Sequence, residues 1–375
     1  MIYFDNAATT RPNSGAVERA LAFTNEHFFN PSARYRGGLK VHGELKTARE
    51  FLLKCVADPI QFDLIFTSGG TEGDNHAIFS AAKRGNVVIS GGEHAAVFES
   101  AKELKNRGLE VRIAPLCSDG SVSVEGVLSL VDDKTSLVGI IHVNNETGAV
   151  NDIVSIARLV KGKNSRTVFM SDGVQAFGKI PVKLSKDIDL YTVSAHKIGG
   201  LKGCGALIKN KNCRGLSPLV FGGGQENGYR SGTENVLGIM AFYYAAEETF
   251  RNQKEKAEQV YAVRDRVKSL LDRNLFTVIS SESGSPYILS VSARALRGEV
   301  LQHMLEEESL IVGTGSACSS KKPYSRVIEA CGREKEELSG VLRLSFSPEN
   351  TLEEAEKAAD MLNKAASSLA RKLLR

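Results

Sequence analysis

Short apolar runs and amphipathic stretches alternate along the first 210 residues of this chain. Apolar positions between Leu39 and Val56 fall near helical spacing, whereas the short run 63–67 predicts a strand. The same criteria predict further strands over 86–90, 110–114, 136–143, 167–170, 188–193 and 205–208, and helices over 74–83, 95–106, 124–131 and 153–160. This alternation is typical of an α/β fold with a mostly parallel sheet that helices cover on both faces, with 205–208 as an antiparallel hairpin partner.

The pattern changes in the last third of the chain. A helical pattern runs from about Glu234 to Arg273, which exceeds the usual helix length, so we expect a break near 251–252. Strands over 287–291 and 341–346 and helices over 299–306 and 352–374 then predict a smaller α+β domain, to which the first dozen residues can return. We therefore expect a large α/β domain over 13–250 and a small domain over 251–375 with 1–12.

The bulk composition excludes several classes of protein. The 375 residues are 42% hydrophobic and 25% charged, which is an ordinary globular mixture. Because 48 basic residues face 44 acidic ones with no long basic run, we expect no nucleic-acid binding. No apolar stretch is long enough for a membrane span, and no export signal opens the chain. The six cysteines lack the spacing of a zinc or disulfide site, so we expect no metal and a cytoplasmic location.

Several predicted strands end in residues that can do chemistry, and ligands of parallel sheets collect at the carboxyl ends of the strands. Residues 194–200 (Ser-Ala-His-Lys-Ile-Gly-Gly) follow the run 188–193 and place Lys197 at its end. A lysine amine that is partly desolvated, or that lies near another cation, can form a Schiff base with a carbonyl cofactor. The ordinary alternative is a solvated surface lysine.

Four other strand ends carry candidate ligands. Residues 68–71 (Ser-Gly-Gly-Thr) can hold a phosphate through helix-start amides and the Thr71 hydroxyl, or form an ordinary tight turn. Their spacing matches neither a P-loop nor a dinucleotide fingerprint. Asp172 can hold a cofactor's ring nitrogen protonated, or cap a helix. His94 can stack on a flat ring or exchange protons near neutral pH, or serve structure alone. The segment 144–148 offers amide donors or a plain turn.

Two candidates lie in the predicted small domain. Residues 313–320 (Gly-Thr-Gly-Ser-Ala-Cys-Ser-Ser) hold almost nothing larger than cysteine, so we expect a mobile surface loop with an accessible thiol at Cys318. An unperturbed thiol is only a few per cent thiolate at pH 7, so a reactive Cys318 needs a basic neighbour. The other five cysteines are expected to pack inertly. Arg343 suits a bidentate grip on a carboxylate, or a surface ion pair.

These segments together resemble the cysteine desulfurases, a group within the class V aminotransferases of the fold-type I pyridoxal-phosphate enzymes. The matching segments span nearly the whole chain in order: 3–10 (Tyr-Phe-Asp-Asn-Ala-Ala-Thr-Thr), 30–32, 66–72, 93–94, 144–148, 172–175, 194–197, 230–235, 315–318 and 343–345. Each is modest alone, whereas all of them in one order are a strong match. The resemblance implies a seven-stranded, mostly parallel sheet with helices on both faces, plus a smaller α+β domain.

The resemblance also implies a role for individual residues. Lys197 resembles the Schiff-base lysine for pyridoxal 5'-phosphate, Asp172 the partner of the pyridine nitrogen, and His94 the residue that stacks on the ring. The remaining implied roles are phosphate binding by Gly70, Thr71, Ser194, His196 and, from a neighbouring subunit, Thr233; bonding of the phenolic oxygen by Gln175; cofactor and substrate-carboxylate contacts by Asn145; a substrate-carboxylate contact by Arg343; and sulfur acceptance by Cys318.

The implied activity is conversion of L-cysteine to L-alanine, with the sulfur left on Cys318 as a persulfide. A homodimer would deliver it to an acceptor protein, such as an iron–sulfur scaffold or a tRNA-thiolation enzyme. Selenocysteine lysis, transamination or a catalytically silent scaffold are the alternatives, and a thiol at Cys318 disfavours plain transamination. Tyr35 and Leu201 depart from the family pattern, at positions that are not cofactor ligands in the family.

Overall fold

The computed structural model describes residues 1–315 and 324–373, and within these ranges the larger of its sheets has seven strands. Their spatial order is β2-β8-β7-β6-β5-β3-β4. The strands are β2 (Phe62–Thr67), β3 (Asn86–Ser90), β4 (Glu110–Ala114), β5 (Thr135–Gly139), β6 (Val168–Asp172), β7 (Leu190–Ser194) and β8 (Gly205–Asn210). β4, β3, β5, β6 and β7 pair in parallel, and β8 pairs antiparallel with both β7 and β2. The predicted α/β sheet, including the antiparallel hairpin partner, is confirmed.

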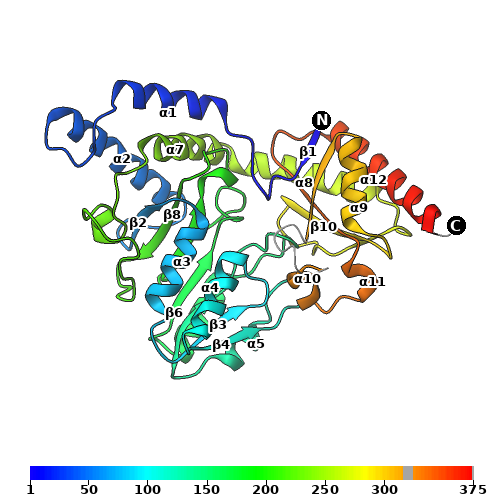
Figure 1. Cartoon of the computed structure of the whole chain (residues 1–375), viewed down its shortest axis with the longest axis horizontal. Helices are drawn as coiled ribbons and strands as arrows, with labels where there is room; N and C mark the ends of the chain where they lie inside the picture. Colours follow the sequence, from blue (N-terminus) through cyan, green and yellow to red (C-terminus); the bar gives the residue numbers. More distant parts are fainter. Residues whose placement is uncertain (316–323, 374–375) are drawn as a thin grey trace.

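Helices cover both faces of this sheet, because successive residues of each strand point to opposite sides. On one face, Ile89 and its neighbours pack with α3 (Gly70–Ala81) and α4 (Ala95–Asn106). On the other face, Val88 belongs to the core that includes α2 (Arg36–Lys54), α5 (Val124–Leu130), α6 (Ile153–Lys163) and α7 (Val236–Phe250). Figure 1 shows the sheet between these layers. Burial on both faces explains why its strands read as continuous apolar runs.

One helix of this part had no predicted counterpart. α1 (Ser14–Glu26) starts at Asn13, whose side-chain oxygen accepts a hydrogen bond from the backbone amide of Ala16 at 2.8 Å. Its buried residues are Ala16 and Ala20, so its apolar stripe is short and made of small side chains. Such a stripe is too weak for periodicity to reveal. Packing against α7 stabilises this helix.

A second sheet, with five strands in the described ranges, has the order β1-β11-β12-β10-β9. Its strands are β1 (Ile2–Phe4), β9 (Phe276–Val278), β10 (Ile288–Ala293), β11 (Leu310–Thr314) and β12 (Val341–Ser345). Its helices are α8 (Gln253–Leu270), α9 (Gly298–Glu307), α10 (Arg326–Ala330), α11 (Lys335–Leu338) and α12 (Leu352–Leu373). β1 pairs in parallel with β11, so the start of the chain does return to this part (Figure 1). The domain boundaries at 12 and 250 stay a prediction.

Two expectations for the last third of the chain have clear outcomes. The long helical pattern breaks where predicted, since α7 ends at Phe250 and Asn252 adopts a left-handed conformation with φ 57° before α8. The expected surface loop over 313–320 is wrong at its start, because Gly313 and Thr314 are buried residues of β11. Cys318 and the rest of that segment up to residue 323 lie outside the described residues. Within the described ranges, no helix has both the length and the apolar character that crossing a bilayer requires.

The long last helix offers a direct test of this fold. Leu362 of α12 is 1% exposed within the core of the smaller sheet, whereas Leu352 at the start of the same helix is 52% exposed. We expect Leu362→Ala to lower the free energy of unfolding by about 2–5 kcal/mol, because it leaves a cavity. The matched change Leu352→Ala should stay within about 0.5 kcal/mol. Urea unfolding followed by circular dichroism measures both, and equal effects would contradict this packing.

Candidate active site

The predicted site residues gather at one edge of the larger sheet. β2, β3, β5, β6 and β7 run in the same direction, since β2 and β7 are both antiparallel to β8, so their carboxyl ends share that edge. Lys197 lies in a single 3₁₀ turn directly after β7. Its Nζ donates to the backbone carbonyls of Ala7 at 2.5 Å and Ala8 at 2.8 Å. The lysine amine therefore contacts the segment that leads from β1 to α1. It is not the solvated surface lysine that we considered as the alternative.

Asp172 and His94 lie together beside this lysine. Asp172 ends β6, is buried, and accepts a hydrogen bond from the backbone amide of Val174 at 2.9 Å. His94 precedes α4, and its Nδ1 accepts from the amide of Ala96 at 3.2 Å, so the neutral ring carries its proton on Nε2. Burial lowers the pKa of His94, against the opposing charge of Asp172. Both side chains thus accept a hydrogen bond from a backbone amide two residues later, in addition to lying at the site.

Sequence analysis missed a second acid at this point. Asp74 of α3 is 1% exposed, and one ligand atom each of Asp74, His94 and Asp172 lie within 4.8 Å of one another. Burial, then the neighbouring Asp172, raises the pKa of Asp74 well above its usual value. Burial also raises the pKa of Asp172, but His94 and Lys197 oppose that shift. Of the two acids, Asp74 therefore has the more strongly raised pKa, and Asp172 is the one whose negative charge His94 and Lys197 favour.

The start of α3 lies close against the neighbouring strand ends. A Cβ on Gly70 would lie 2.8 Å from a methyl of Val174 and 3.8 Å from Cβ of Ser194, so glycine is needed there. Ser194 is buried at the end of β7, and Thr71 is exposed in the first turn of α3. The first turn of a helix presents unpaired amides that favour anions. The predicted phosphate ligands Gly70, Thr71 and Ser194 are thus side by side.

The other two predicted phosphate ligands differ in their placement. His196 Nδ1 lies 3.1 Å from Oγ1 of Thr9, and burial, then Lys197, lowers the pKa of His196 to about 4. The ring is therefore neutral at pH 7. Thr233 is exposed on the segment before α7, and its predicted role across a subunit boundary stays a prediction. Arg230 of the same segment pairs with Glu72 of α3 at 2.9 Å, which ties this segment to the candidate phosphate site.

The smaller sheet contributes Arg343, from β12. Its Nη2 donates to Asp5 Oδ1 at 2.8 Å and its Nη1 to the Asn145 carbonyl at 3.0 Å. The Arg343 side chain is only 12% exposed, so this is not the surface ion pair that we considered as the alternative. Arg343 Nε and Asn145 Oδ1 are buried and have no hydrogen-bond partner among residues 1–315 and 324–373. Both atoms are therefore suited to a ligand.

Glycine at position 313 makes room for this ion pair. A Cβ there would lie 2.8 Å from Asp5 Oδ1 and 2.9 Å from Arg343 Nη2. Neither Asp5 nor Gly313 was assigned a role from the sequence. Asp5 lies in a segment that matched the family pattern, and Gly313 in one that was interpreted as a loop. Asp5 is 308 positions from Gly313 and 338 from Arg343 in the chain, so periodicity could not reveal this contact.

Gln175 follows Asp172 in the turn after β6. Its Nε2 donates to the Ala7 carbonyl at 2.8 Å, the same oxygen that Lys197 contacts. Its Oε1 accepts from Nζ of Lys179, a lysine that sequence analysis did not single out. Gln175 and Lys197 therefore meet at one backbone carbonyl, while their predicted roles toward the cofactor stay predictions.

Both ends of the segment that carries Cys318 meet the site. Ser325 Oγ donates to Glu146 Oε2 at 2.5 Å, and a Cβ on Gly315 would lie 3.1 Å from the same oxygen. Glu146 directly follows Asn145. Arg326 donates to the carbonyls of Gly91 and Glu93, beside His94. The chain therefore leaves and re-enters the described structure next to the predicted substrate contacts.

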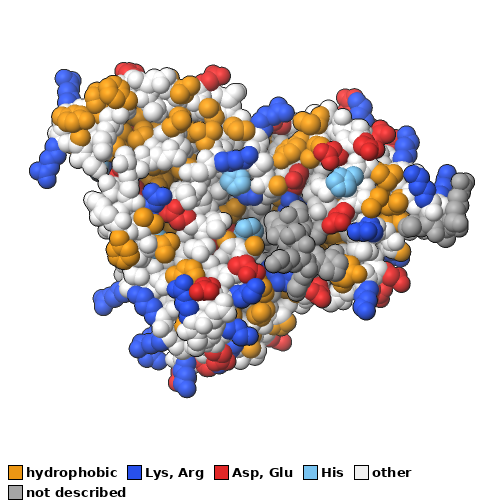
Figure 2. Space-filling model, in the orientation of Figure 1, with side chains coloured by type: hydrophobic (Ala, Val, Ile, Leu, Met, Phe, Trp, Pro, Cys, Tyr) orange, Lys and Arg blue, Asp and Glu red, His pale blue; other side chains and the backbone are white. Residues whose placement is uncertain are grey.

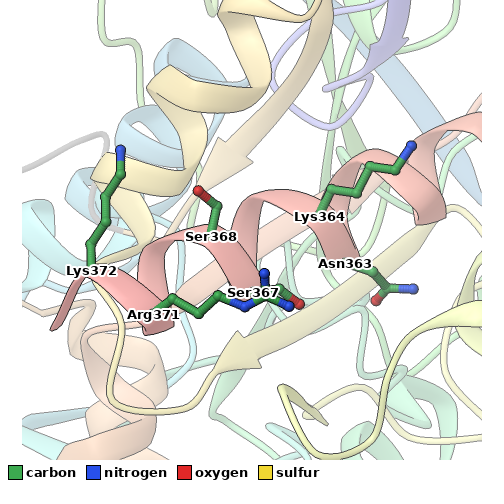
Figure 3. Close-up of a pocket in the computed structure, with 6 residues that line it drawn as sticks. All are labelled: Asn363, Lys364, Ser367, Ser368, Arg371 and Lys372. Carbon is green, nitrogen blue, oxygen red and sulfur yellow. The ribbon is translucent and has the colours of Figure 1, made fainter. Parts of the chain in front are cut away.

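A surface hollow of about 490 Å³ lies along α12, away from these residues. Its lining consists of Asn363, Lys364, Ser367, Ser368, Arg371 and Lys372, all on that helix (Figure 3). Another cavity, of about 390 Å³, lies between Lys179 and α8.

Figure 2 shows histidine side chains near the middle of this face of the molecule, where the two sheets meet.

The model of the aminotransferase class-V family matches residues 2–357. The chain belongs to this family. It is 36% identical to a NifS/IcsS protein homolog of Lactobacillus delbrueckii subsp. bulgaricus, over 95% of each chain. It is 35% identical to the cysteine desulfurase IscS 1 of Archaeoglobus fulgidus, over 96% of each chain. These relatives confirm the predicted resemblance to the cysteine desulfurases within the family.

Solved structures agree with this assignment. A NifS-like protein superposes with a TM-score of 0.91 at 33% identity, covering 98% of this chain and 100% of that one. A structure titled SspA in complex with cysteine superposes with a TM-score of 0.77 at 26% identity, covering 93% of this chain and 99% of that one. The predicted fold class, that of the fold-type I enzymes, is confirmed.

The raised pKa of Asp74 can be tested by measuring how the free energy of unfolding depends on pH. A buried carboxyl with a raised pKa binds more protons in the folded than in the unfolded state, so folded-state stability falls as pH rises above about 4. We expect Asp74→Asn to raise the free energy of unfolding by about 1–3 kcal/mol at pH 7.5, with the gain vanishing near pH 4. Urea unfolding across this pH range measures the effect. The exposed Asp133→Asn is the control, and a gain that does not change with pH would contradict the assignment.

Proposed function

We propose that this member of the family is a pyridoxal-phosphate-dependent cysteine desulfurase, which converts L-cysteine to L-alanine and leaves the sulfur as a persulfide on Cys318. The observation that carries the proposal is the convergence of Lys197, Asp172, His94 and Gln175 on one sheet edge, with Arg343 facing them from the other sheet. The curated relatives named cysteine desulfurase support it.

The residues at this edge fit pyridoxal phosphate. The buried Asp172 carboxylate suits a protonated pyridine nitrogen, and the start of α3 with the neutral His196 suits a phosphate. When bound, the cofactor supplies an electron sink for the electrons released at Cα of the substrate.

The chain's own residues then hold the reactants and move protons. Asp172 would keep the ring nitrogen of the cofactor protonated, and His94 would stack on the ring. Arg343 would bind the carboxylate of cysteine through its Nε, with the side-chain NH2 of Asn145 as a second donor. The Lys197 amine is the group placed to take the proton from Cα, because its position is fixed by two backbone carbonyls.

Sulfur transfer is assigned to Cys318. Its thiolate attacks the sulfur of the bound cysteine, so that an S–S bond forms and the Cβ–S bond breaks. The electron pair of the broken bond stays with carbon, which takes up a proton and leaves as alanine. Glu146 accepts a hydrogen bond from Ser325, which follows the segment that carries Cys318, and Gly315, which precedes that segment, lies close to the same carboxyl oxygen. Because the reaction needs a reduced thiol, we also propose a cytoplasmic location. The persulfide sulfur has to leave Cys318 before the next turnover, so we propose a separate protein as the final sulfur acceptor.

We further propose that the protein is a homodimer. Large apolar side chains are exposed on α1, on α2 and between them: Leu21, Phe28, Tyr35 and Leu39. Figure 2 shows apolar side chains gathered on this part of the surface. A contiguous apolar patch marks an interaction site, and a second copy would also give the exposed Thr233 a phosphate to reach.

The dimer is tested by sedimentation. The chain has a mass of 40.5 kDa, and we expect a species of twice that mass at micromolar concentration. The double change Phe28→Asp and Leu39→Asp should shift it toward the monomer, because charges would be buried at the interface. Ile60→Asp, at an exposed apolar position on another part of the chain, is the matched control. A monomeric wild-type protein would contradict the proposal.

The chemistry is tested with L-cysteine. We expect alanine to form and one sulfur atom to be added to the Cys318 peptide, read by mass spectrometry. Cys318→Ala should abolish sulfide release, since it removes the acceptor thiol. Cys117→Ala is the matched control: Cys117 is exposed, contrary to our expectation of inert packing, and should keep full activity. Unchanged turnover with keto acids in Cys318→Ala would favour transamination, and exclusive turnover of selenocysteine would favour a lyase.

A further inference from the structure

We propose that Lys179 is a positioning residue that fixes the orientation of the Gln175 side-chain amide, so that its NH2 group faces the catalytic site. The inference rests on the proposed function, since the value of this orientation depends on a cofactor at Gln175. Lys179 belongs to the segment after β6 and has no role in the activity described above.

The hydrogen bonds determine which way the amide points. Lys179 is 4% exposed, and its Nζ donates to Gln175 Oε1 at 2.7 Å. A charged lysine has three donors and no acceptor, so the amide oxygen has to face it. The amide nitrogen then points the opposite way, where it donates to the Ala7 carbonyl at 2.8 Å. Lys197 donates to that same carbonyl, so a continuous chain of hydrogen bonds joins the two lysines.

The orientation matters because the two ends of an amide have the same shape but opposite chemistry. With NH2 toward the site, Gln175 offers a donor to an anionic phenolic oxygen, whereas a flipped amide would offer its own oxygen and repel it. The Ala7 carbonyl favours the observed orientation only while the amide nitrogen donates to it, and this hydrogen bond would be lost if the nitrogen donated to a bound cofactor instead. Lys179 still donates to the amide oxygen in that case, so the orientation of the amide is kept.

The surroundings of Lys179 make a purely structural role a poor explanation. Its Nζ lies 5.8 Å from the centre of the Tyr287 ring, and the charged groups that affect it are Lys197 and Arg343, both cations. Lys254 and Glu258 of α8 line the cavity beside it, but among the described residues no carboxylate forms an ion pair with Lys179 or shifts its pKa. A buried ammonium without a counter-ion costs stability, and perturbed lysines of this kind cluster at functional sites.

The same surroundings predict a pH dependence. Burial, then Lys197 and Arg343, lowers the pKa of Lys179 to about 7, and its charge in turn contributes to the low pKa of His196. Below pH 7 the ammonium can only donate. Above pH 7 a neutral amine can also accept, so its hold on the amide orientation weakens. The orientation should therefore be best defined on the acidic side of neutrality.

A double-mutant cycle on the cofactor-loaded protein tests the proposal. Lys179→Met and Gln175→Ala are each compared with the double variant, by pyridoxal phosphate affinity and by the pH midpoint of the bound cofactor's visible absorbance. We expect each single change to weaken cofactor binding on the order of tenfold and to move the midpoint in the same direction. The double variant should lose no more than Gln175→Ala alone, because Lys179 acts through Gln175.

The controls separate this proposal from simpler effects. Lys202→Met removes an exposed positive charge that also acts on His196, and it should show no coupling to Gln175. Lys179→Gln, whose amide both donates and accepts, should fall between wild type and Lys179→Met, and it serves in place of Met if that variant does not fold. Thermal unfolding of each variant reports folding.

Two outcomes would overturn the proposal. One is an unchanged affinity and midpoint in Lys179→Met and Lys179→Gln. The other is a double variant whose losses multiply, which would show that the Lys179 charge acts on the cofactor independently of Gln175. A wild-type protein that takes up no pyridoxal phosphate would instead overturn the proposed function, so the two failures are distinguishable.

Discussion

The structure of the site depends on the buried Asp172 carboxylate and the cation opposite it. An isolated charge in a protein interior is very costly, so it persists only with compensating partners. Here the compensation comes from the Val174 amide, from Lys197 and from His94. Asp74 has no such cation among the groups that act on it, so burial and the neighbouring Asp172 raise its pKa well above the usual value. The two neighbouring acids are therefore driven toward different protonation states.

This pairing is possible because one segment joins the two sheets. Residues 5–9 lie between β1 and α1: Asp5 pairs with Arg343, Ala7 accepts from Lys197 and Gln175, and Thr9 contacts His196. The segment is itself closed by Tyr3, whose hydroxyl donates to the Thr9 carbonyl at 2.9 Å. The smaller sheet therefore does more than carry Arg343. Through β1, it also sets the position of the Ala7 carbonyl, to which Lys197 of the larger sheet donates a hydrogen bond.

The sequence predicted the architecture of the larger sheet well, because strands buried on both faces have continuous apolar runs. It also predicted that Lys197, Asp172 and His94 would meet, because each ends a strand of that sheet. It did not predict β11, whose last residues Gly313 and Thr314 merge with a run of small residues. Nor did it identify Asp74, because the partners that make an acid within a helix unusual come from strands distant in the sequence.

The same reason explains why Lys179 and Asp5 were missed. Periodicity records which side chains are buried, but not which polar atoms they meet. Lys179 lies four residues after Gln175, a spacing that in a surface helix would indicate nothing more than a solvated pair. Only the tertiary structure shows that it is buried and that its partner contacts the same carbonyl as Lys197.

The charge balance of the whole site links these observations to the ligands. Lys179, Lys197 and Arg343 are close enough that the last two lower the pKa of the first. Of the acids nearby, Asp74 is protonated, and burial raises the pKa of Glu93 to about 8. Asp5 already pairs with Arg343, and Glu146 accepts from Ser325, while Arg343 Nε is buried without a partner in the described chain. A protein edge with this excess of positive charge attracts anions, and a phosphate and an amino-acid carboxylate are the anions that the proposed reaction brings to it.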